Sequence, residues 1–132
     1  MRTVYILDTC VLISDPKAFQ KYPNQDIVIP ITVLDELDKL KQSHSEASKN
    51  ARIAIRNLDA LCQLGQIHKG VTLEDGTTVK IDTFVYDNNF GSDAKMDDKI
   101  LACALAISKN RKTKPTTLVS RDINLRVRAN AF

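Results

Sequence analysis

Short apolar runs divide the chain and predict the strands of a sheet. Residues 4–7 form a continuous apolar run with β-branched and aromatic members, the pattern of a strand covered on both faces, as in a parallel sheet. A second run, 27–29, ends at Pro30, which cannot donate to a central ladder and so closes the strand before a helix. Two further strands are predicted at 83–86 and 116–120.

Helical periodicity appears between these runs. Apolar residues recur at helical spacing over 33–40, 51–62 and 100–107. Residues 71–81 alternate loosely around Asp75-Gly76, a dipeptide whose tolerance of positive φ suits a tight hairpin turn. The order of these elements predicts an α/β fold: a central, mainly parallel twisted sheet with helices on both faces and a small β-hairpin insertion.

The composition fits a single soluble domain that spans residues 1–132. Of its 132 residues, 43% are apolar and 27% are charged, which excludes disordered, collagenous and repeat chains. The three cysteines form no Cys-x-x-Cys pair and lie in or beside apolar runs, which favours core residues in a reducing cytoplasm. No stretch approaches the roughly 20 apolar residues of a membrane span, so neither a signal peptide nor a membrane anchor is expected.

Acidic residues stand just beyond several of the apolar runs, at Asp8, Glu36, Asp97 or Asp98, and Asp122. Because the carboxyl ends of the strands in an open α/β sheet border one crevice, we expect these side chains to converge. Ionised carboxylates at about 4 Å repel by about 4 kcal/mol per pair at an effective dielectric of about 20, so such a cluster requires a cation. Oxygen-only ligands suit Mg²⁺ or Mn²⁺, and that site predicts hydrolysis of phosphodiester bonds.

Each of these acids also has a structural interpretation. Asp8 and Asp122 fit helix N-caps or Asx turns, and Asp97 fits the positive end of a helix dipole. On a helical wheel, Glu36 and Asp38 flank the apolar stripe equally, so the periodicity does not choose between them. The residues alone therefore leave the ligand set open.

The segments that carry the acids resemble the PIN-domain ribonucleases, in the order of that family and over essentially the whole chain. The segments are Tyr5-Ile-Leu-Asp8-Thr-Cys-Val-Leu, Pro30-Ile-Thr-Val-Leu-Asp-Glu36-Leu-Asp, Asp98-Lys-Ile-Leu-Ala-Cys-Ala and Leu118-Val-Ser-Arg-Asp122-Ile-Asn124. The Asp75-Gly76 hairpin and the Ser-Arg-Asp-Ile-Asn-Leu-Arg ending look most like the PIN domain that precedes a PhoH-type ATPase module. The resemblance thus implies that such an ATPase domain is a partner in a longer natural chain.

The resemblance further implies a three-layer PIN-like fold and a metal-dependent nuclease that acts on single-stranded RNA. Its acidic cluster would be Asp8, Glu36, Asp98 and Asp122, with Mg²⁺ or Mn²⁺ as the cofactor. The family pattern selects Asp98, whereas the helical wheel aligns Asp97 with the apolar side, and Asp97 is kept as a reserve ligand.

Other polar side chains complete the predicted site. Thr9, Ser120 and Asn124 are able to orient water or a carboxylate by hydrogen bonding. Between Lys109 and Arg128 the chain carries seven basic residues against one acid, a local charge of +6. Together with the polar side of the helix over 51–62, this segment predicts contacts with an RNA backbone. The basic residues expected to make them are Arg121, Arg126, Arg128, Lys49 and Arg52.

Rival enzyme classes fit the sequence less well. A haloacid-dehalogenase-like phosphatase needs a second acid two residues after Asp8, where this chain has Cys10. A receiver domain would have an acidic pair after the first strand and a Lys after the last, where this chain has Ser120-Arg121-Asp122. The alternative that stays open is a non-catalytic PIN-fold module that binds RNA or a partner protein, and homo-oligomer formation is left open as well.

Overall fold

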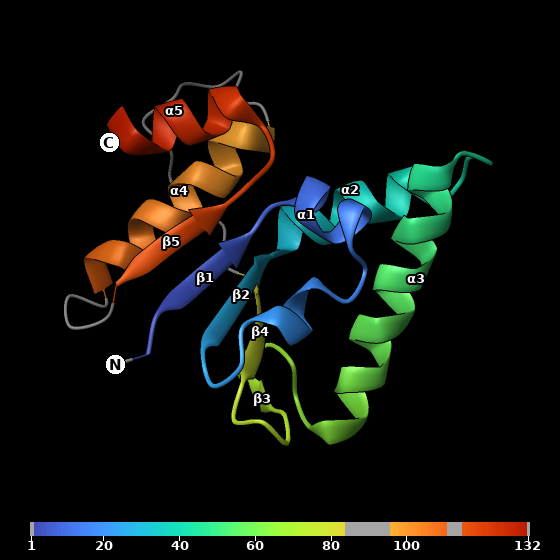
Figure 1. The fold of residues 1–132 in the computed structure, drawn as a ribbon, viewed down its shortest axis with the longest axis horizontal. Helices are drawn as coiled ribbons and strands as arrows, with labels where there is room; N and C mark the ends of the chain where they lie inside the picture. Colours follow the sequence, from blue (N-terminus) through green and yellow to red (C-terminus); the bar gives the residue numbers. More distant parts are fainter. Residues whose placement is uncertain (1, 84–95, 111–114, 132) are drawn as a thin grey trace.

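A sheet of five strands forms the centre of the described part of the protein (Figure 1). The computed structural model describes residues 2–83, 96–110 and 115–131. The strands are β1 (Val4–Leu7), β2 (Asp26–Pro30), β3 (Val71–Thr72), β4 (Thr78–Asp82) and β5 (Thr116–Val119). The helices are α1 (Thr9–Ser14), α2 (Ile31–Leu40), α3 (Glu46–Leu61), α4 (Met96–Asn110) and α5 (Ile123–Ala131), with short 3₁₀ turns η1 (Ala18–Lys21) and η2 (Cys62–Leu64).

The strand order β3-β4-β2-β1-β5 places the first strand of the chain inside the sheet. β1 pairs in parallel with β2 on one side and with β5 on the other, and β4 pairs in parallel with β2. These four strands therefore end at one edge of the sheet, which we call the carboxyl edge and define by Leu7, Pro30, Asp82 and Val119. The predicted mainly parallel α/β sheet is confirmed.

The predicted hairpin is also confirmed, but its second arm is a core strand. β3 and β4 pair antiparallel, and β4 then pairs with β2 over its whole length. In the described residues the strand that follows β2 in the parallel sheet lies at 78–82. Of the strand predicted at 83–86, Thr83 lies outside any strand, and 84–86 fall outside the described residues. The alternation that suggested a free hairpin arises because Val79 and Ile81 are buried while Lys80 is only half-buried.

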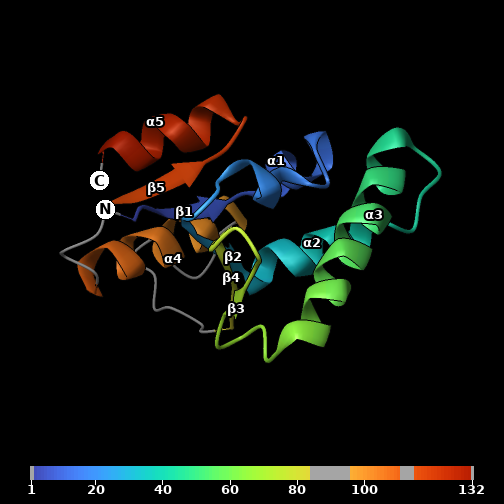
Figure 2. The ribbon, with the colours of Figure 1, turned by 60° about the horizontal axis from the view of Figure 1, so that its bottom comes forward.

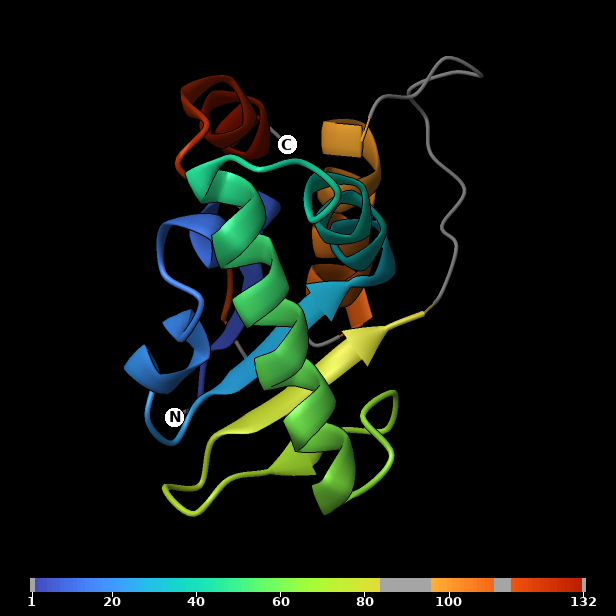
Figure 3. The ribbon, with the colours of Figure 1, turned by 90° about the vertical axis from the view of Figure 1, so that its right-hand side faces the viewer.

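Helices cover the two faces of the sheet in separate layers. Figure 3 shows α3 on one face of β2 and β4 and α4 on the opposite face. Ile27 and Ile29 of β2 belong to the same buried cluster as Ala54 and Leu58 of α3, and each Ile or Leu side chain contributes about 1.5–3 kcal/mol on burial. None of the helices in the described ranges has the length and apolar content needed to cross a bilayer.

The last helix, α5, is an element that the apolar pattern did not predict. In Figure 2, α5 and α4 lie on opposite sides of β5. Leu125 is fully buried, whereas Ile123 and Val127 are 71% and 63% exposed. Because only one of these apolar side chains faces the core, the segment has no clear helical stripe.

Arg2 connects the amino ends of β1 and β2 to the hairpin turn. Its Nε donates to Asp26 Oδ1 at 2.9 Å, and its Nη1 donates to Asn24 Oδ1 at 3.0 Å. Its Nη2 donates to the carbonyl oxygen of Gly76 at 2.8 Å. Asp26 is 7% exposed and also accepts from Thr78 Oγ1 at 2.7 Å, so this buried carboxylate is compensated by charge and by hydrogen bonds.

Replacing Gly76 by Ala is expected to destabilise the fold by about 1–3 kcal/mol. Gly76 has φ +86°, and an added Cβ would lie 2.7 Å from Asn24 Oδ1, an atom that Arg2 holds in place. The matched control is Gly70→Ala, where φ is +103° but nothing lies within 4 Å of the added Cβ. Urea denaturation measures both, and equal losses would mean that the contact with Asn24 contributes nothing.

Candidate functional site

The carboxyl edge brings Asp8 and Ser120 into direct contact. Leu7 pairs with Val119, so the residues that follow β1 and β5 leave the sheet side by side. Ser120 Oγ donates to Asp8 Oδ2 at 2.6 Å, and Asp8 Oδ1 accepts from the Thr9 backbone N–H at 2.7 Å. Asp8 is 5% exposed. Its carboxylate is therefore fixed in orientation by donors from two segments that are far apart in sequence.

Cys10 is a member of this site that the sequence analysis assigned to the core. Its Sγ donates to Asp8 Oδ2 at 3.3 Å and accepts from the Arg121 backbone N–H at 3.2 Å. Burial, and the nearby Asp8 carboxylate, raise the pKa of the Cys10 thiol, which keeps the thiol protonated as a donor. The apolar run around Cys10 carried no signal of this role, because it depends on the neighbouring β5 segment.

Asp122 lies on the same edge but acts as a helix cap. Its Oδ1 accepts from the Asn124 backbone N–H at 2.9 Å and the Leu125 backbone N–H at 3.4 Å, at the start of α5. Its own backbone N–H donates to Ser120 Oγ at 3.0 Å. The predicted supporting residue Asn124 thus meets Asp122 through its backbone, a contact that other residue types would also provide.

Glu36 lies on α2 and lines a pocket of about 350 Å³ between α2 and α4. Its side chain is half-buried, whereas Asp38 is exposed and pairs with Lys41 Nζ at 2.6 Å. The helical wheel left these two acids open, and the structure places Glu36 rather than Asp38 at a pocket. Three further charged residues line the same pocket and were not predicted as part of the site: Asp35 and Lys39 of α2 and Lys99 of α4.

The side chains of Asp97 and Asp98 lie outside the described residues, although both positions belong to α4. Among the side chains that the structure describes, no three His, Cys, Asp or Glu are grouped closely enough to hold a metal ion. Asp8, Glu36 and Asp122 by themselves therefore do not form a cluster. The predicted convergence of all four acids stays a prediction.

Two buried hydroxyl groups near these acids have no hydrogen-bond partner in the described part of the chain. Thr9 Oγ1 belongs to the residue that follows Asp8, and Thr32 Oγ1 belongs to a residue that lines the Glu36 pocket. Buried hydroxyls in proteins are normally hydrogen-bonded, so these two are exceptions within the described residues.

Asp82 is a further carboxylate at the carboxyl edge. It is the last residue of β4, is 8% exposed, and accepts from Cys103 Sγ of α4 at 3.3 Å. Burial raises the pKa of the Cys103 thiol, which keeps that donor protonated. The sequence contained the relevant signal, an acid that ends a β-rich run, but the predicted strand at 83–86 concealed it.

Some of the predicted RNA-binding side chains donate hydrogen bonds to other groups of the protein, and others are exposed. Arg52 Nη1 donates to the carbonyl oxygens of Lys41 and Ser43, at 2.8 and 3.3 Å, and so closes the connection between α2 and α3. Arg121 Nη1 donates to Ser14 Oγ at 2.6 Å. Lys49 and Arg126 are exposed, and Arg128 is half-buried.

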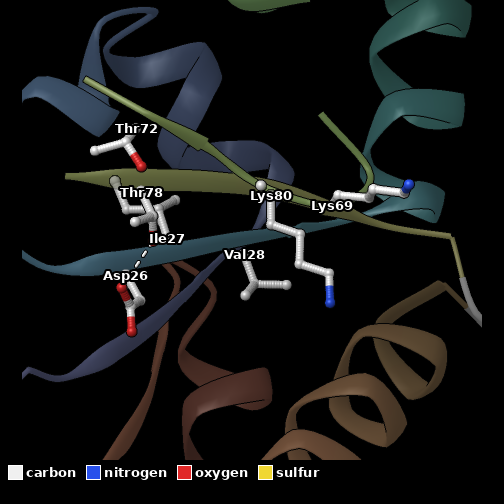
Figure 4. A pocket seen from close by; sticks show the side chains of 8 residues that line it. Asp26, Ile27, Val28, Lys69, Thr72, Thr78 and Lys80 are labelled. Carbon is white, nitrogen blue, oxygen red and sulfur yellow. Dashed lines mark hydrogen bonds between the residues drawn. The ribbon is translucent and has the colours of Figure 1, made fainter. Parts of the chain in front are cut away.

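A separate pocket of about 270 Å³ lies on the sheet between β2, β3 and β4 and contains none of the predicted site residues (Figure 4). Two lysines line it, but Figure 4 shows the side chains of Lys69 and Lys80 extending in different directions. Its Thr78 hydroxyl is already bonded to Asp26. These features make it a weaker candidate than the Glu36 pocket.

Comparisons with known proteins agree with the arrangement of the strands and helices. The profile of the PIN domain family matches residues 5–132. A domain of a functionally unknown protein from Methanocaldococcus jannaschii has a similar fold, with a TM-score of 0.60 and 17% identity, over 98% of this chain and 85% of that one. At this identity the likeness concerns the fold alone.

Three curated relatives are bacterial proteins called PhoH2. The Bacillus subtilis protein is 37% identical over 140 residues, covering 100% of this chain and 32% of its own length. The Mycolicibacterium smegmatis protein is 35% identical, with 96% and 30% covered, and the Thermobispora bispora protein is 33% identical, with 95% and 29% covered. This chain therefore spans about a third of the length of these relatives.

Proposed function

The chain belongs to the PIN domain family, and we propose that it is a metal-dependent ribonuclease that hydrolyses phosphodiester bonds of single-stranded RNA. The observation that carries the proposal is the Asp8 carboxylate, nearly buried at the carboxyl edge and oriented by Ser120, Cys10 and the Thr9 backbone. Burying a carboxylate costs free energy that these donors offset in part, and they hold the carboxylate in one orientation, as the hydrogen-bond partners of metal ligands do.

The residues proposed to hold the metal are Asp8, Glu36, Asp98 and Asp122, with Asp97 in reserve. All of them offer oxygen, the ligand that Mg²⁺ and Mn²⁺ prefer, and the partnerless hydroxyl of Thr9 fits a metal-bound water nearby. When bound, the metal would activate water and offset charge on the phosphate. Ser120 and Cys10 would keep Asp8 Oδ2 in one orientation.

The longer relatives support a proposal about the natural setting of this domain. Because this chain matches about a third of each PhoH2 protein, we propose that it acts beside a PhoH-type ATPase domain of a longer chain. RNA delivered by that domain would reach the carboxyl edge. The cytoplasm is the proposed compartment.

The direct test is cleavage of a labelled single-stranded RNA with Mg²⁺ or Mn²⁺, with EDTA and with a fully paired duplex. We expect cleavage that requires the metal and prefers the single strand. A second candidate function is a non-catalytic module, favoured by the helix-cap contacts of Asp122. Metal-dependent RNA binding without cleavage would support that module instead.

Replacing Ser120 by Ala is expected to weaken Mn²⁺ binding about 10–100-fold, because groups that orient a metal ligand typically contribute that much. The change removes the 2.6 Å hydrogen bond to Asp8 Oδ2 and the acceptor of the Asp122 N–H. Calorimetric titration of Mn²⁺ measures the effect. Ser108→Ala, at an exposed position of α4, is the matched control. Equal affinities for the two variants would show that Ser120 has only a turn role.

A further inference from the structure

We propose that Lys39 and Lys99 form a phosphate-binding pair that holds the backbone of single-stranded RNA beside Glu36. The inference rests on the proposed function, because it names how that site would recognise its substrate. It concerns residues from two helices, α2 and α4, that line one pocket of about 350 Å³.

The pocket is built from one face of α2. Thr32, Glu36 and Lys39 are spaced four and three residues apart, so their side chains share a face of the helix. The neighbouring Val33 and Leu37 are fully buried and point into the core instead. Lys99 closes the pocket from α4, next to the predicted ligand position Asp98.

The charged groups of this pocket are available to a ligand. Within the described residues, the side chains of Glu36, Lys39 and Lys99 make no hydrogen bond and no ion pair. Two other lysines form ion pairs: Lys21 Nζ lies 2.7 Å from Asp15 Oδ2, and Lys41 Nζ lies 2.6 Å from Asp38 Oδ1. Asp35 also lines the pocket, so the lining holds two carboxylates and two ammonium groups. With Glu36 assigned to the metal, the two ammonium groups exceed the remaining carboxylate by one positive charge, which favours an anion.

The hydrogen-bond donors that this pocket offers to a ligand are the ammonium groups of Lys39 and Lys99. Thr32 also lines the pocket, but its Oγ1 is buried, so this hydroxyl does not face the open space. The two ammonium groups supply what the non-bridging oxygens of a phosphodiester require.

The pocket suits a phosphate better than a base. None of its lining residues is aromatic, so it offers no stacking surface. Lysine acts on phosphate as a compact point charge and reads no base edge. We therefore expect binding that depends on salt but hardly on sequence. By contrast, Arg52 and Arg121 already donate to groups of the protein itself.

The experiment measures RNA binding without cleavage, in EDTA, for the double variant Lys39→Gln/Lys99→Gln. We expect the affinity for labelled oligo(U) and oligo(A) to fall at least about tenfold, equally for both. The slope of log affinity against log salt should decrease by about 0.7 for each phosphate that the variant no longer neutralises. Lys17→Gln, an exposed lysine that lines neither pocket, is the matched control.

A second arm separates the sources of the phosphate. Competition by uridine 5′-monophosphate should be weak for the wild type, because a backbone site uses several nucleotides of a strand. The melting temperature should match the wild type because both lysines are exposed, and Mn²⁺ affinity should not fall, because the variant removes positive charges that repel a cation beside Glu36. The proposal would be overturned if the double variant had the RNA affinity and the salt slope of the wild type. It would also be overturned if RNA affinity fell in a third variant, Arg126→Gln, but not in the double variant.

Failure of this inference and failure of the proposed nuclease are distinguishable. If the wild type does not cleave RNA but the double variant still loses RNA affinity, the phosphate site stands and the non-catalytic module is favoured. If the wild type cleaves and the double variant binds RNA normally, the nuclease stands and the two lysines are excluded from substrate binding.

Discussion

Replacing Asp8 by Asn is expected to lower metal-dependent RNA cleavage by about a hundredfold or more. A metal ion supplies several kcal/mol of stabilisation to such a reaction, and about 1.4 kcal/mol corresponds to a factor of ten. Asn keeps the size of the side chain and one oxygen, but it removes the charge that attracts the cation. Initial rates on a labelled single-stranded RNA, measured across a Mn²⁺ titration, give the result.

The same variant separates a metal ligand from a helix cap. Asp8 accepts from the Thr9 backbone N–H as the N-cap of α1. Asn caps helices about as well as Asp, so the fold should survive, with circular dichroism and cooperative melting retained. Asp59→Asn, at an exposed position of α3, is the control for loss of one negative charge. Wild-type cleavage by the Asp8 variant would refute the metal-nuclease mechanism.

Replacing Arg2 by Ala is expected to destabilise the protein by about 2–3 kcal/mol, less than the roughly 3–5 kcal/mol for breaking a fully buried ion pair, because Arg2 itself is partly exposed. The change leaves Asp26 without the guanidinium at 2.8 Å, and it also frees the side chain of Asn24 and the Gly76 carbonyl. Urea denaturation measures the loss. Arg56→Ala, at an exposed position of α3, should lie within about 0.5 kcal/mol of the wild type.

A double variant tests the cause of that loss. If the loss of the guanidinium charge beside Asp26 is responsible, adding Asp26→Asn to Arg2→Ala should restore part of the stability, because an amide costs less to bury than a carboxylate. The free energy of unfolding of the single variant Asp26→Asn completes the comparison. If Asp26→Asn costs as much stability in the Arg2→Ala background as in the wild type, the two residues act independently.

The sequence predicted the central part of the sheet because its strands are buried on both faces. The runs at 4–7 and 27–29 are continuous and apolar, and the structure confirms both as β1 and β2. β4 was missed as a parallel strand because it stands next to β3 and exposes one face in part, so that Lys80 interrupts the apolar pattern. α5 was missed because its only fully buried apolar residue is Leu125.

The candidate site was predictable to a similar extent. The sequence predicted polar groups at the carboxyl ends of parallel strands, but the contact between Asp8 and Ser120 also requires that β1 and β5 are neighbours in the observed register. The place of Cys10 depends on the register of β5 against β1, which no local pattern contains. The local excess of basic residues suggested Arg52 and Arg121 as RNA contacts. A count of charges does not show that each guanidinium donates a hydrogen bond to a carbonyl or hydroxyl oxygen of the protein itself.

The pairing of β1 with β5 has a consequence for the order in which the protein is made. Ser120 is 112 residues beyond its hydrogen-bond partner Asp8. At a translation rate of about 5–20 residues per second, the ribosome adds Ser120 roughly 6–20 s after Asp8. Until then β1 has no strand paired on the side that β5 will occupy, and the Asp8 carboxylate lacks its shortest hydrogen bond. The candidate site is therefore incomplete while the nascent chain is still on the ribosome, beside the messenger RNA that encodes it.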